Sequence, residues 1–278
     1  MAEEVMVQKV AVLREALTRY YDEVSAVFST DEVIFDLMRL RNYTSEAMYN
    51  TLKEMGVFRV NSMSDINLFV QGYSMKQLSD FGLLNAEGEF LLAGRYVLPI
   101  RDITGQVTAL VGWSEYGGPK KYVTTPTFGF SRDATFFNYD SFRLAHEKFG
   151  GVTFLVEGIF DSVALKSLGF PVLGAQGLEL SSIKRRMLRR YTKVIAMHDD
   201  DKAGMGVSPY LNKLSSKPAS LIWDIETEHT FVRILDKTDT VDESKVKDSD
   251  DLIKYYDAYD DLVKAMSAKK LYNIVLED

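Results

Sequence analysis

The chain has 278 residues, of which 46% are hydrophobic and 26% charged, and its formal net charge is −7. This length and apolar fraction suffice for one to three compact units. There is no cysteine and there are only three histidines, which excludes disulfides and thiolate zinc sites and argues against a histidine-based zinc site. Any bound metal is therefore expected to take oxygen ligands, as magnesium, manganese and calcium do.

No apolar run approaches the roughly 20 residues of a membrane span. The N-terminal stretch also lacks the long apolar core and cleavage site of a signal peptide. Together with the missing cysteines, these features predict a cytoplasmic protein without a membrane partner. The charges are unevenly placed, because KRRMLRR at 184–190 is basic while HDDD at 198–201 and KDSDD at 247–251 are acidic. An acidic metal site beside basic patches fits this distribution.

Residues 1–56 are expected to form an N-terminal helical region. Apolar residues recur at helical spacing from Val10 to Tyr20. A second helix is expected over 31–41, with an N-cap among Ser29, Thr30 and Asp31. A third begins at the capping-box pattern of Thr44 and stops at Gly56. The stretch YSMKQLSDFGLL predicts one more short helix.

Residues 57–150 are expected to form a mixed α/β subdomain. From Arg95 the runs RYVLPI, QVTALVGW and KKYVTT are β-rich and are separated by turn residues, which predicts a small antiparallel sheet. SFRLAHEKFG then predicts a helix that ends at Gly150.

From residue 151 the pattern alternates between strands and helices. The strands are VTFLV, PVLGA and KVIAMH, and the helices are DSVALKSLG, SSIKRRMLRRY and AGMGVSPYLNKL. This alternation predicts a parallel sheet covered by helices over 151–250, followed by C-terminal helices over 251–278. In SSIKRRMLRRY the apolar stripe favours an ordinary amphipathic helix with an outward basic face, and a contact with a nucleic-acid backbone is the alternative.

Three acids follow two of these strands. Glu157 ends VTFLV, and Asp199 and Asp201 follow KVIAMH. Functional groups of parallel sheets gather beyond the carboxyl ends of the strands, and Asp199 and Asp201 point the same way in an extended segment. Converging carboxylates repel one another unless a divalent cation lies between them. Ordinary solvated acids are the alternative for any one of the three, but the set predicts a metal site.

The same residues resemble a known family. VEGIFDSVAL followed by MHDDDKAG resembles the Toprim signature, in the form found in DnaG-type bacterial primases. Upstream, GRYVLPIRDITGQVTALVGW and PKKYVTTP resemble the segment that precedes Toprim in those primases, and KDSDDLI resembles their third acidic motif. The resemblance spans about residues 40–255. It implies an α/β fold, with a Toprim sheet, an N-terminal mixed α+β subdomain and C-terminal helices.

The resemblance also implies roles for particular residues. Glu157, Asp199 and Asp201 are the expected catalytic metal ligands, with Asp248 and Asp250 as further ligands and two Mg²⁺ or Mn²⁺ ions. Asp161 is expected to cap or orient the helix that follows it, behind the ligands. The expected nucleotide- and template-binding residues, each with a solvated surface residue as the alternative, are Arg95, Arg101, Lys120, Lys121, Tyr122 and Lys202.

The implied activity is synthesis of RNA primers on single-stranded DNA from nucleoside triphosphates. The family's zinc module and helicase-binding domain have no counterpart here, and Asp200 replaces the family's glycine between the two aspartates. The resemblance therefore implies a catalytic core, of a kind that would suit a phage, with a replicative helicase or a separate DNA-binding or zinc-module protein as partner. The alternatives are a Toprim nuclease, a type IA topoisomerase, which the chain's length disfavours, and a non-catalytic scaffold that binds single-stranded DNA.

Overall fold

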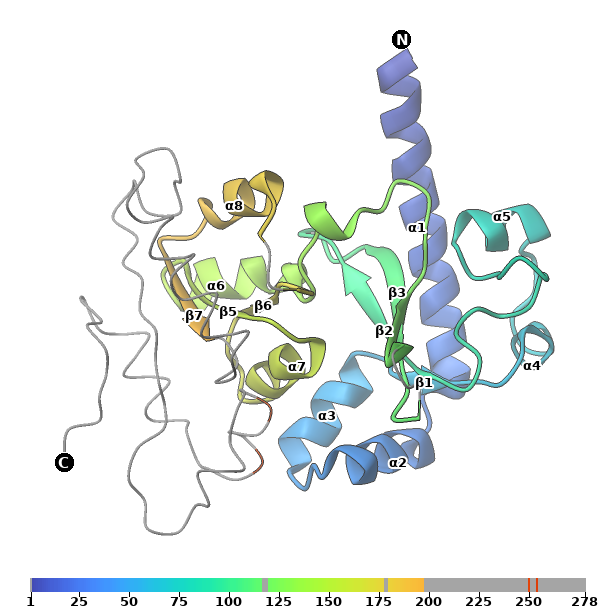
Figure 1. Cartoon of the computed structure of the whole chain (residues 1–278), viewed down its shortest axis with the longest axis horizontal. Coiled ribbons are helices and arrows are strands. Elements are labelled where there is room, and N and C mark those ends of the chain that lie inside the picture. Colours follow the sequence, from blue (N-terminus) through green and yellow to red (C-terminus); the bar gives the residue numbers. More distant parts are fainter. Residues whose placement is uncertain (1, 117–119, 178–179, 198–249, 251–253, 255–278) are drawn as a thin grey trace. The chain divides into compact units, whose positions relative to one another are not determined.

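The computed structural model describes residues 2–116, 120–177, 180–197, 250 and 254 (Figure 1). The chain divides into two compact units, residues 1–131 and 132–278. Within the described residues, no helix is both long and apolar enough to cross a membrane.

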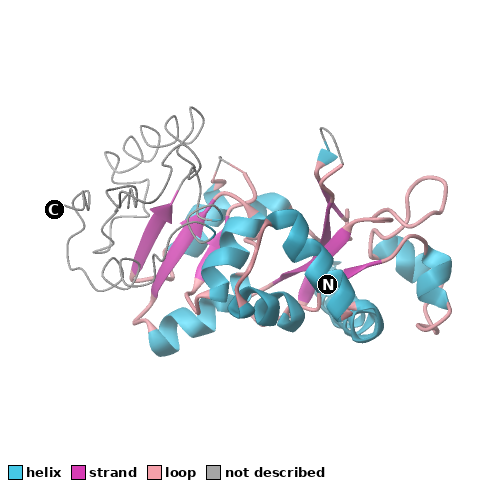
Figure 2. Cartoon of the chain, turned by 90° about the horizontal axis from the view of Figure 1, so that it is seen from below, coloured by secondary structure: helices cyan, strands magenta, loops and turns pink. Residues whose placement is uncertain are grey.

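The first unit combines helices with one antiparallel sheet, as the sequence predicts. The sheet has the strand order β1-β2-β3-β4, and its strands are drawn in magenta in Figure 2. The strands are β1 (Phe58–Arg59), β2 (Tyr96–Arg101), β3 (Val107–Trp113) and β4 (Tyr122–Thr124). The helices are α1 (Ala2–Phe28), α2 (Asp31–Arg41), α3 (Glu46–Glu54), α4 (Met63–Asn67) and α5 (Met75–Asp80).

The caps of these helices follow from local sequence. Thr30 caps α2, because its side chain accepts a hydrogen bond from the Val33 amide. For α3 the expected cap at Thr44 is wrong: the Ser45 side chain accepts from the Met48 amide instead. Ser74 and Gln77 form a reciprocal capping box at the start of α5. The five-residue helix α4 was not predicted, because so short a segment leaves no clear periodicity.

The core of the first unit lies between α1 and the sheet. Leu17, Tyr20, Tyr21 and Val24 line one face of α1, and all are at most 2% exposed. A polar contact fixes the register between the helix and the sheet, since the Val107 amide donates to Thr18 Oγ1 at 2.8 Å. This helix therefore supports the sheet that carries Arg95 and Tyr122.

The second unit contains the predicted parallel sheet, in the order β6-β5-β7. Its strands are β5 (Val152–Val156), β6 (Val172–Gly174) and β7 (Lys193–Met197). Its helices are η2 (Arg132–Ala134), η3 (Tyr139–Ser141), α6 (Phe142–Lys148), α7 (Ile159–Ser167) and α8 (Ser182–Leu188). The helix expected at AGMGVSPYLNKL and the C-terminal helices expected after residue 251 lie outside the described residues, apart from Lys254.

Residues 132–150 lie in this second unit, upstream of the Toprim domain expected from residue 151. Phe137 forms a β-bridge with Gly174, in which each amide donates to the other carbonyl at 2.9 Å. Phe136 and Phe137 are fully buried. The bridge thus covers the open edge of β6, and this pairing is long-range, so local sequence patterns do not reveal it.

Candidate active site

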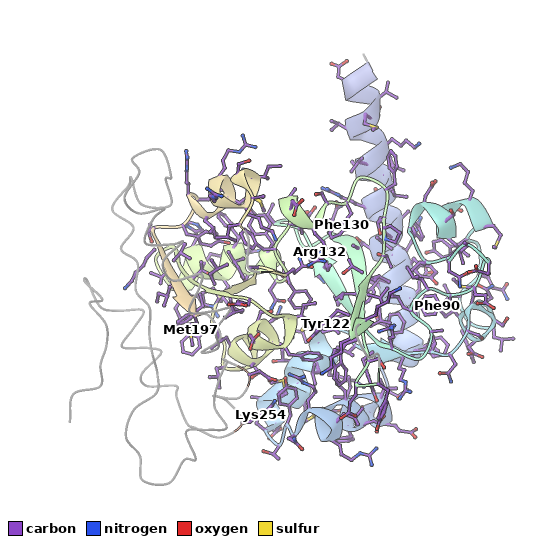
Figure 3. The ribbon with its side chains drawn as sticks, in the orientation of Figure 1. Phe90, Tyr122, Phe130, Arg132, Met197 and Lys254 are labelled. Atoms are coloured by element: carbon purple, nitrogen blue, oxygen red, sulfur yellow. The ribbon has the colours of Figure 1, made fainter. Side chains whose placement is uncertain are left out.

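Glu157 lies where the central strand of the parallel sheet ends. It follows β5 directly and is half-buried. Val156, the last residue of β5, is paired with Gly174 of β6 and with Met197 of β7. Met197 is labelled in Figure 3 and precedes Asp199 by two residues in the sequence. Asp199, Asp201 and Lys202 themselves lie outside the described residues.

Asp161 closes the start of α7. Gly158 is the N-cap residue and has no side chain to offer the helix. A Cβ atom at Gly158 would lie 2.2 Å from Asp161 Oδ2, which shows that the carboxylate folds back over this turn. Asp161 is 8% exposed. An acid at the third helical position suits the positive end of the helix dipole.

The other oxygen of Asp161 contacts the acidic motif near the C-terminus. The Asp250 amide donates to Asp161 Oδ1 at 3.1 Å. The Asp250 side chain is 4% exposed, and Lys254 Nζ lies 2.8 Å from its Oδ2. Asp161 thereby links the turn after Glu157 to a residue 89 positions away. Asp248 lies outside the described residues.

The donor atoms of these acids fit a magnesium or manganese ion, which prefers carboxylate oxygens. Among the described residues, no three histidines or acids gather into a group able to hold a metal. The predicted set includes Asp199, Asp201 and Asp248, which are not described. The two-ion site therefore stays a prediction, and the described part supplies Glu157 at the strand end and the hydrogen bond between Asp161 and Asp250.

Arg95, Lys120 and Lys121 come together in the first unit. The Arg95 guanidinium donates to the carbonyl oxygens of Lys120 at 3.0 Å and Lys121 at 3.2 Å. Gly112 makes this path possible, because a Cβ there would lie 2.9 Å from Arg95 Cδ. Both lysine side chains are exposed. Arg95 thus holds the start of β4, where two cations face solvent.

Tyr122 continues this exposed edge. Tyr122 of β4 is paired with Trp113 of β3, and Trp113 is paired with Tyr96 of β2. Tyr96 is in turn paired with Arg59 of β1. Residues paired across antiparallel strands point to the same face of the sheet. Tyr122 is 43% exposed, whereas Tyr96 and Trp113 are buried. An exposed aromatic ring beside cations is the combination used to bind single-stranded nucleic acid, and Tyr122 is labelled in Figure 3.

Arg101 lies at the opposite end of β2 from Arg95, roughly 20 Å away at ~3.3 Å per residue. Its guanidinium donates to the Gly105 carbonyl at 2.8 Å and lies over the Tyr21 ring, 5.6 Å from its centroid. Asp22 Oδ1 is 3.7 Å away. The structure therefore does not bring Arg101 to the other predicted bases, and its contacts join α1 to the sheet.

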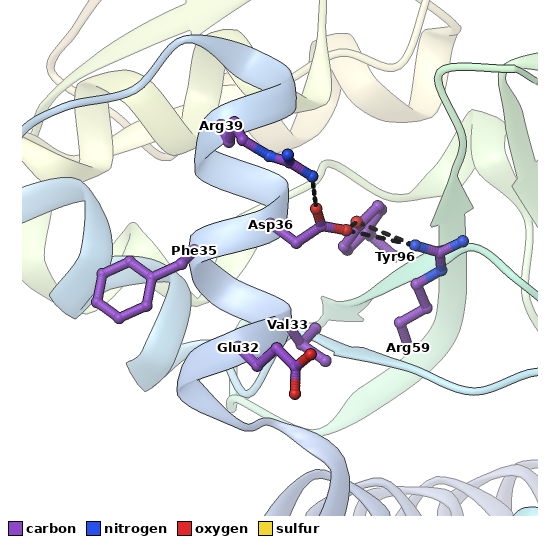
Figure 4. Close-up of a pocket in the computed structure, with 7 residues that line it drawn as sticks. All are labelled: Glu32, Val33, Phe35, Asp36, Arg39, Arg59 and Tyr96. Atoms are coloured by element: carbon purple, nitrogen blue, oxygen red, sulfur yellow. Dashed lines mark hydrogen bonds and ion pairs between the residues drawn. The ribbon is translucent and has the colours of Figure 1, made fainter.

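A pocket of about 630 Å³ lies between α2 and the sheet of the first unit (Figure 4). Asp36 pairs with Arg39 at 2.5 Å and with Arg59 at 3.4 Å, and it accepts a short hydrogen bond from the Tyr96 hydroxyl. These hydrogen bonds, from Tyr96 first, lower the pKa of Asp36, and burial raises the pKa of Tyr96 to about 12. The sequence did not predict this cluster, because its members come from three separate elements.

Comparisons with known proteins agree with this architecture. Residues 154–225 match the Toprim-like family model. The chain is 28% identical to a DNA primase of Thermotoga maritima over 61% of its own length and 31% of that protein. It is 31% identical to a DNA primase of Synechococcus elongatus over 40% of its own length and 16% of that protein. It therefore spans a third or less of these two curated relatives.

The fold is also that of a solved structure, a DnaG primase catalytic domain bound to single-stranded DNA. The TM-score is 0.68 at 18% identity, over 92% of this chain and 79% of the other. The parallel sheet and the matched segment, residues 154–225, form a Toprim-like part of an α/β fold. The fold is similar to those of DnaG-type primase catalytic cores, which confirms the resemblance and the fold class predicted from the sequence.

Proposed function

We propose that this chain is a DNA primase core, which synthesises RNA primers on single-stranded DNA from nucleoside triphosphates. The observation that supports this most directly is the position of Glu157 at the carboxyl end of the central Toprim strand, within a DnaG-type fold. In the reaction, a 3′-hydroxyl attacks the α-phosphate of a nucleoside triphosphate, a new P–O bond forms, and pyrophosphate leaves.

The acids carry the metal-dependent part of the proposal. Glu157, Asp199 and Asp201 would hold two Mg²⁺ or Mn²⁺ ions, with Asp248 and Asp250 as further ligands. When bound, the ions neutralise charge at the attacking and leaving oxygens. The Asp161 side chain accepts a hydrogen bond from the Asp250 amide and so orients the third acidic motif relative to the turn after Glu157. The side chains otherwise position the reactants, since this reaction needs little covalent chemistry from the protein.

Basic residues and one aromatic residue are proposed to bind the template and the nucleotide. Lys120, Lys121 and Tyr122 form the exposed edge that contacts the template, and Arg95 holds this edge in place. Lys202 contacts a phosphate of the nucleotide. Single-stranded DNA and nucleoside triphosphates are thus the proposed ligands, and a replicative helicase or a separate DNA-binding protein is the proposed partner, in a cytoplasm.

The test is incorporation of a labelled nucleoside triphosphate on single-stranded DNA templates with Mg²⁺ or Mn²⁺. Primers that lengthen with time support the proposal. Shortening of the DNA without incorporation would instead identify a Toprim nuclease. If neither occurs and calorimetry shows no Mn²⁺ binding, the chain is a DNA-binding scaffold whose acids are unused.

A further inference from the structure

Lys184 is a buried cation that the proposed chemistry does not use. It lies in the first turn of α8 and is 3% exposed. Its ammonium group donates a short hydrogen bond to the Ala175 carbonyl and lies 5.4 Å from the centroid of the Phe136 ring. Burial lowers the pKa of Lys184 to about 8. Burying a charged lysine side chain away from water costs free energy, so the contact that Lys184 makes there is a candidate for a function.

The contact of Lys184 is with the segment that follows β6. The Ala175 amide donates to the Val156 carbonyl at 2.8 Å, and the Gln176 amide donates to the Glu157 carbonyl at 3.0 Å. The backbone pairing between β6 and β5 therefore continues past Gly174 and reaches the candidate metal ligand itself. The position of the Glu157 backbone depends on where residues 175 and 176 lie.

A second cation holds the next carbonyl of the same segment. Arg132, at the start of η2, donates a short hydrogen bond to the Gln176 carbonyl. Arg132 is labelled in Figure 3. Lys184 and Arg132 thus bind the carbonyls of two successive residues whose amides bind the end of β5. We call residues 175–176, with these two cations, the carbonyl clamp.

The backbone of Gln176 requires such support. Its φ is +59°, and the other two described non-glycine residues with positive φ are asparagines, which tolerate this conformation better. A side chain of glutamine size in this region costs about 1 kcal/mol or more, and it persists only where its surroundings hold it. The Gln176 side chain also donates to the Thr135 carbonyl at 3.4 Å.

We propose that Lys184 and Arg132 are positioning residues for Glu157: they hold residues 175–176 in place, and these hold the end of β5 where Glu157 binds its metal. The metal-binding part of this inference rests on the proposed function. Groups that orient metal ligands from behind typically change metal affinity by about 10- to 100-fold when they are removed.

The test compares Lys184→Met with Arg186→Met, a change at an exposed position on the same helix. The first measurement is hydrogen exchange at the Gln176 amide in the metal-free protein, by NMR. The second is Mn²⁺ affinity by calorimetry, well below the melting temperature of each variant. Lys184→Met should speed Gln176 exchange and weaken Mn²⁺ binding about 10-fold. In Lys184→Arg, Gln176 exchange and Mn²⁺ affinity should lie between those of Lys184→Met and wild type. In Arg186→Met, both quantities should equal those of wild type.

A folded Lys184→Met protein with wild-type Gln176 exchange and wild-type Mn²⁺ affinity would overturn the proposal. If Lys184→Met does not fold, Arg132→Ala decides, because Arg132 is exposed and its loss frees only the Gln176 carbonyl. Arg132→Ala should also speed Gln176 exchange and weaken Mn²⁺ binding, but by less than is expected for Lys184→Met. If neither quantity changes in Arg132→Ala, the proposed carbonyl clamp is wrong. A wild-type protein that binds no Mn²⁺ would refute the proposed metal site instead, while the exchange data would still decide whether the clamp positions Glu157's backbone.

Discussion

At the scale of single residues, the predicted basic site residues differ in the contacts they make, even where the residue type is the same. Arg95 and Arg101 begin and end the same short run, RYVLPIR. Arg95 crosses Gly112 to hold the start of β4, whereas Arg101 binds the Gly105 carbonyl and covers Tyr21. The family resemblance predicted that both bind the template or the nucleotide. Their different partners come from distant segments, so the sequence alone could not separate them.

The exposed side chain of Lys121 and the packed side chain of Arg101 predict opposite phenotypes for their alanine variants. Lys121→Ala should reduce the salt dependence of template binding by about one unit of log Kd per log salt, because one fewer counterion is released. Its melting temperature should not change. Arg101→Ala should lower stability by about 1–2 kcal/mol through lost hydrogen bonding and cation–π contact. Fluorescence titrations at several salt concentrations and thermal melts check this, and a reversed pattern would place Arg101 at the template.

Lys184 gives a pH prediction. Its pKa is about 8 in the folded protein, below the ~10.4 of an unfolded lysine, so the unfolded chain binds more protons between these values. The stability that wild type has relative to Lys184→Met should therefore rise with pH from about 8 to 10, by at most about 1 kcal/mol per pH unit. Urea unfolding of both proteins across this range measures the difference. A difference that falls with pH would contradict the assigned environment of Lys184.

At the scale of elements, the sequence predicted the strands and most helices because each has its own periodicity or cap. The three parallel strands, β3 and β4 lie within the predicted runs, and β2 extends one residue beyond its run, to Arg101. The features it did not predict depend on tertiary contacts: the Phe137–Gly174 bridge, the Asp36 cluster, and the carbonyl clamp. For the candidate site, motifs predicted Glu157 and Asp161, but only the fold shows that Asp161 binds the Asp250 amide.

Gly112 tests how one strand positions a functional side chain. In Gly112→Ala the new Cβ would lie 2.9 Å from Arg95 Cδ and 3.1 Å from Leu92 Cδ2, so the Arg95 side chain must move. We expect template affinity to fall about as much as in Arg95→Ala.

A double-mutant cycle provides the control for Gly112→Ala. If Gly112 acts through Arg95, Gly112→Ala should have little further effect on template affinity in the Arg95→Ala background. Fully additive losses in the double variant would show that Gly112 supports template binding by another route.

At the scale of the whole molecule, net charge limits what the chain does alone. The net charge is −7, so non-specific affinity for a polyanionic template should be poor at physiological salt. We expect weak, slow primer synthesis with little preference among start sequences, raised by a partner that increases the local concentration of template. Primer yield on defined templates, with and without candidate helicases, checks this. Nanomolar binding in about 150 mM salt with one defined start site would contradict it.

The central claim is that Glu157 belongs to a metal site that drives nucleotide incorporation. Its most direct test measures incorporation of a labelled nucleoside triphosphate on single-stranded DNA by wild type and by Glu157→Gln, with Mg²⁺ and with Mn²⁺. We predict incorporation by wild type, none by the variant, and a metal-free melting temperature that is unchanged or slightly higher in the variant, because one of several repelling carboxylates is neutral. Wild-type incorporation by Glu157→Gln would contradict the claim.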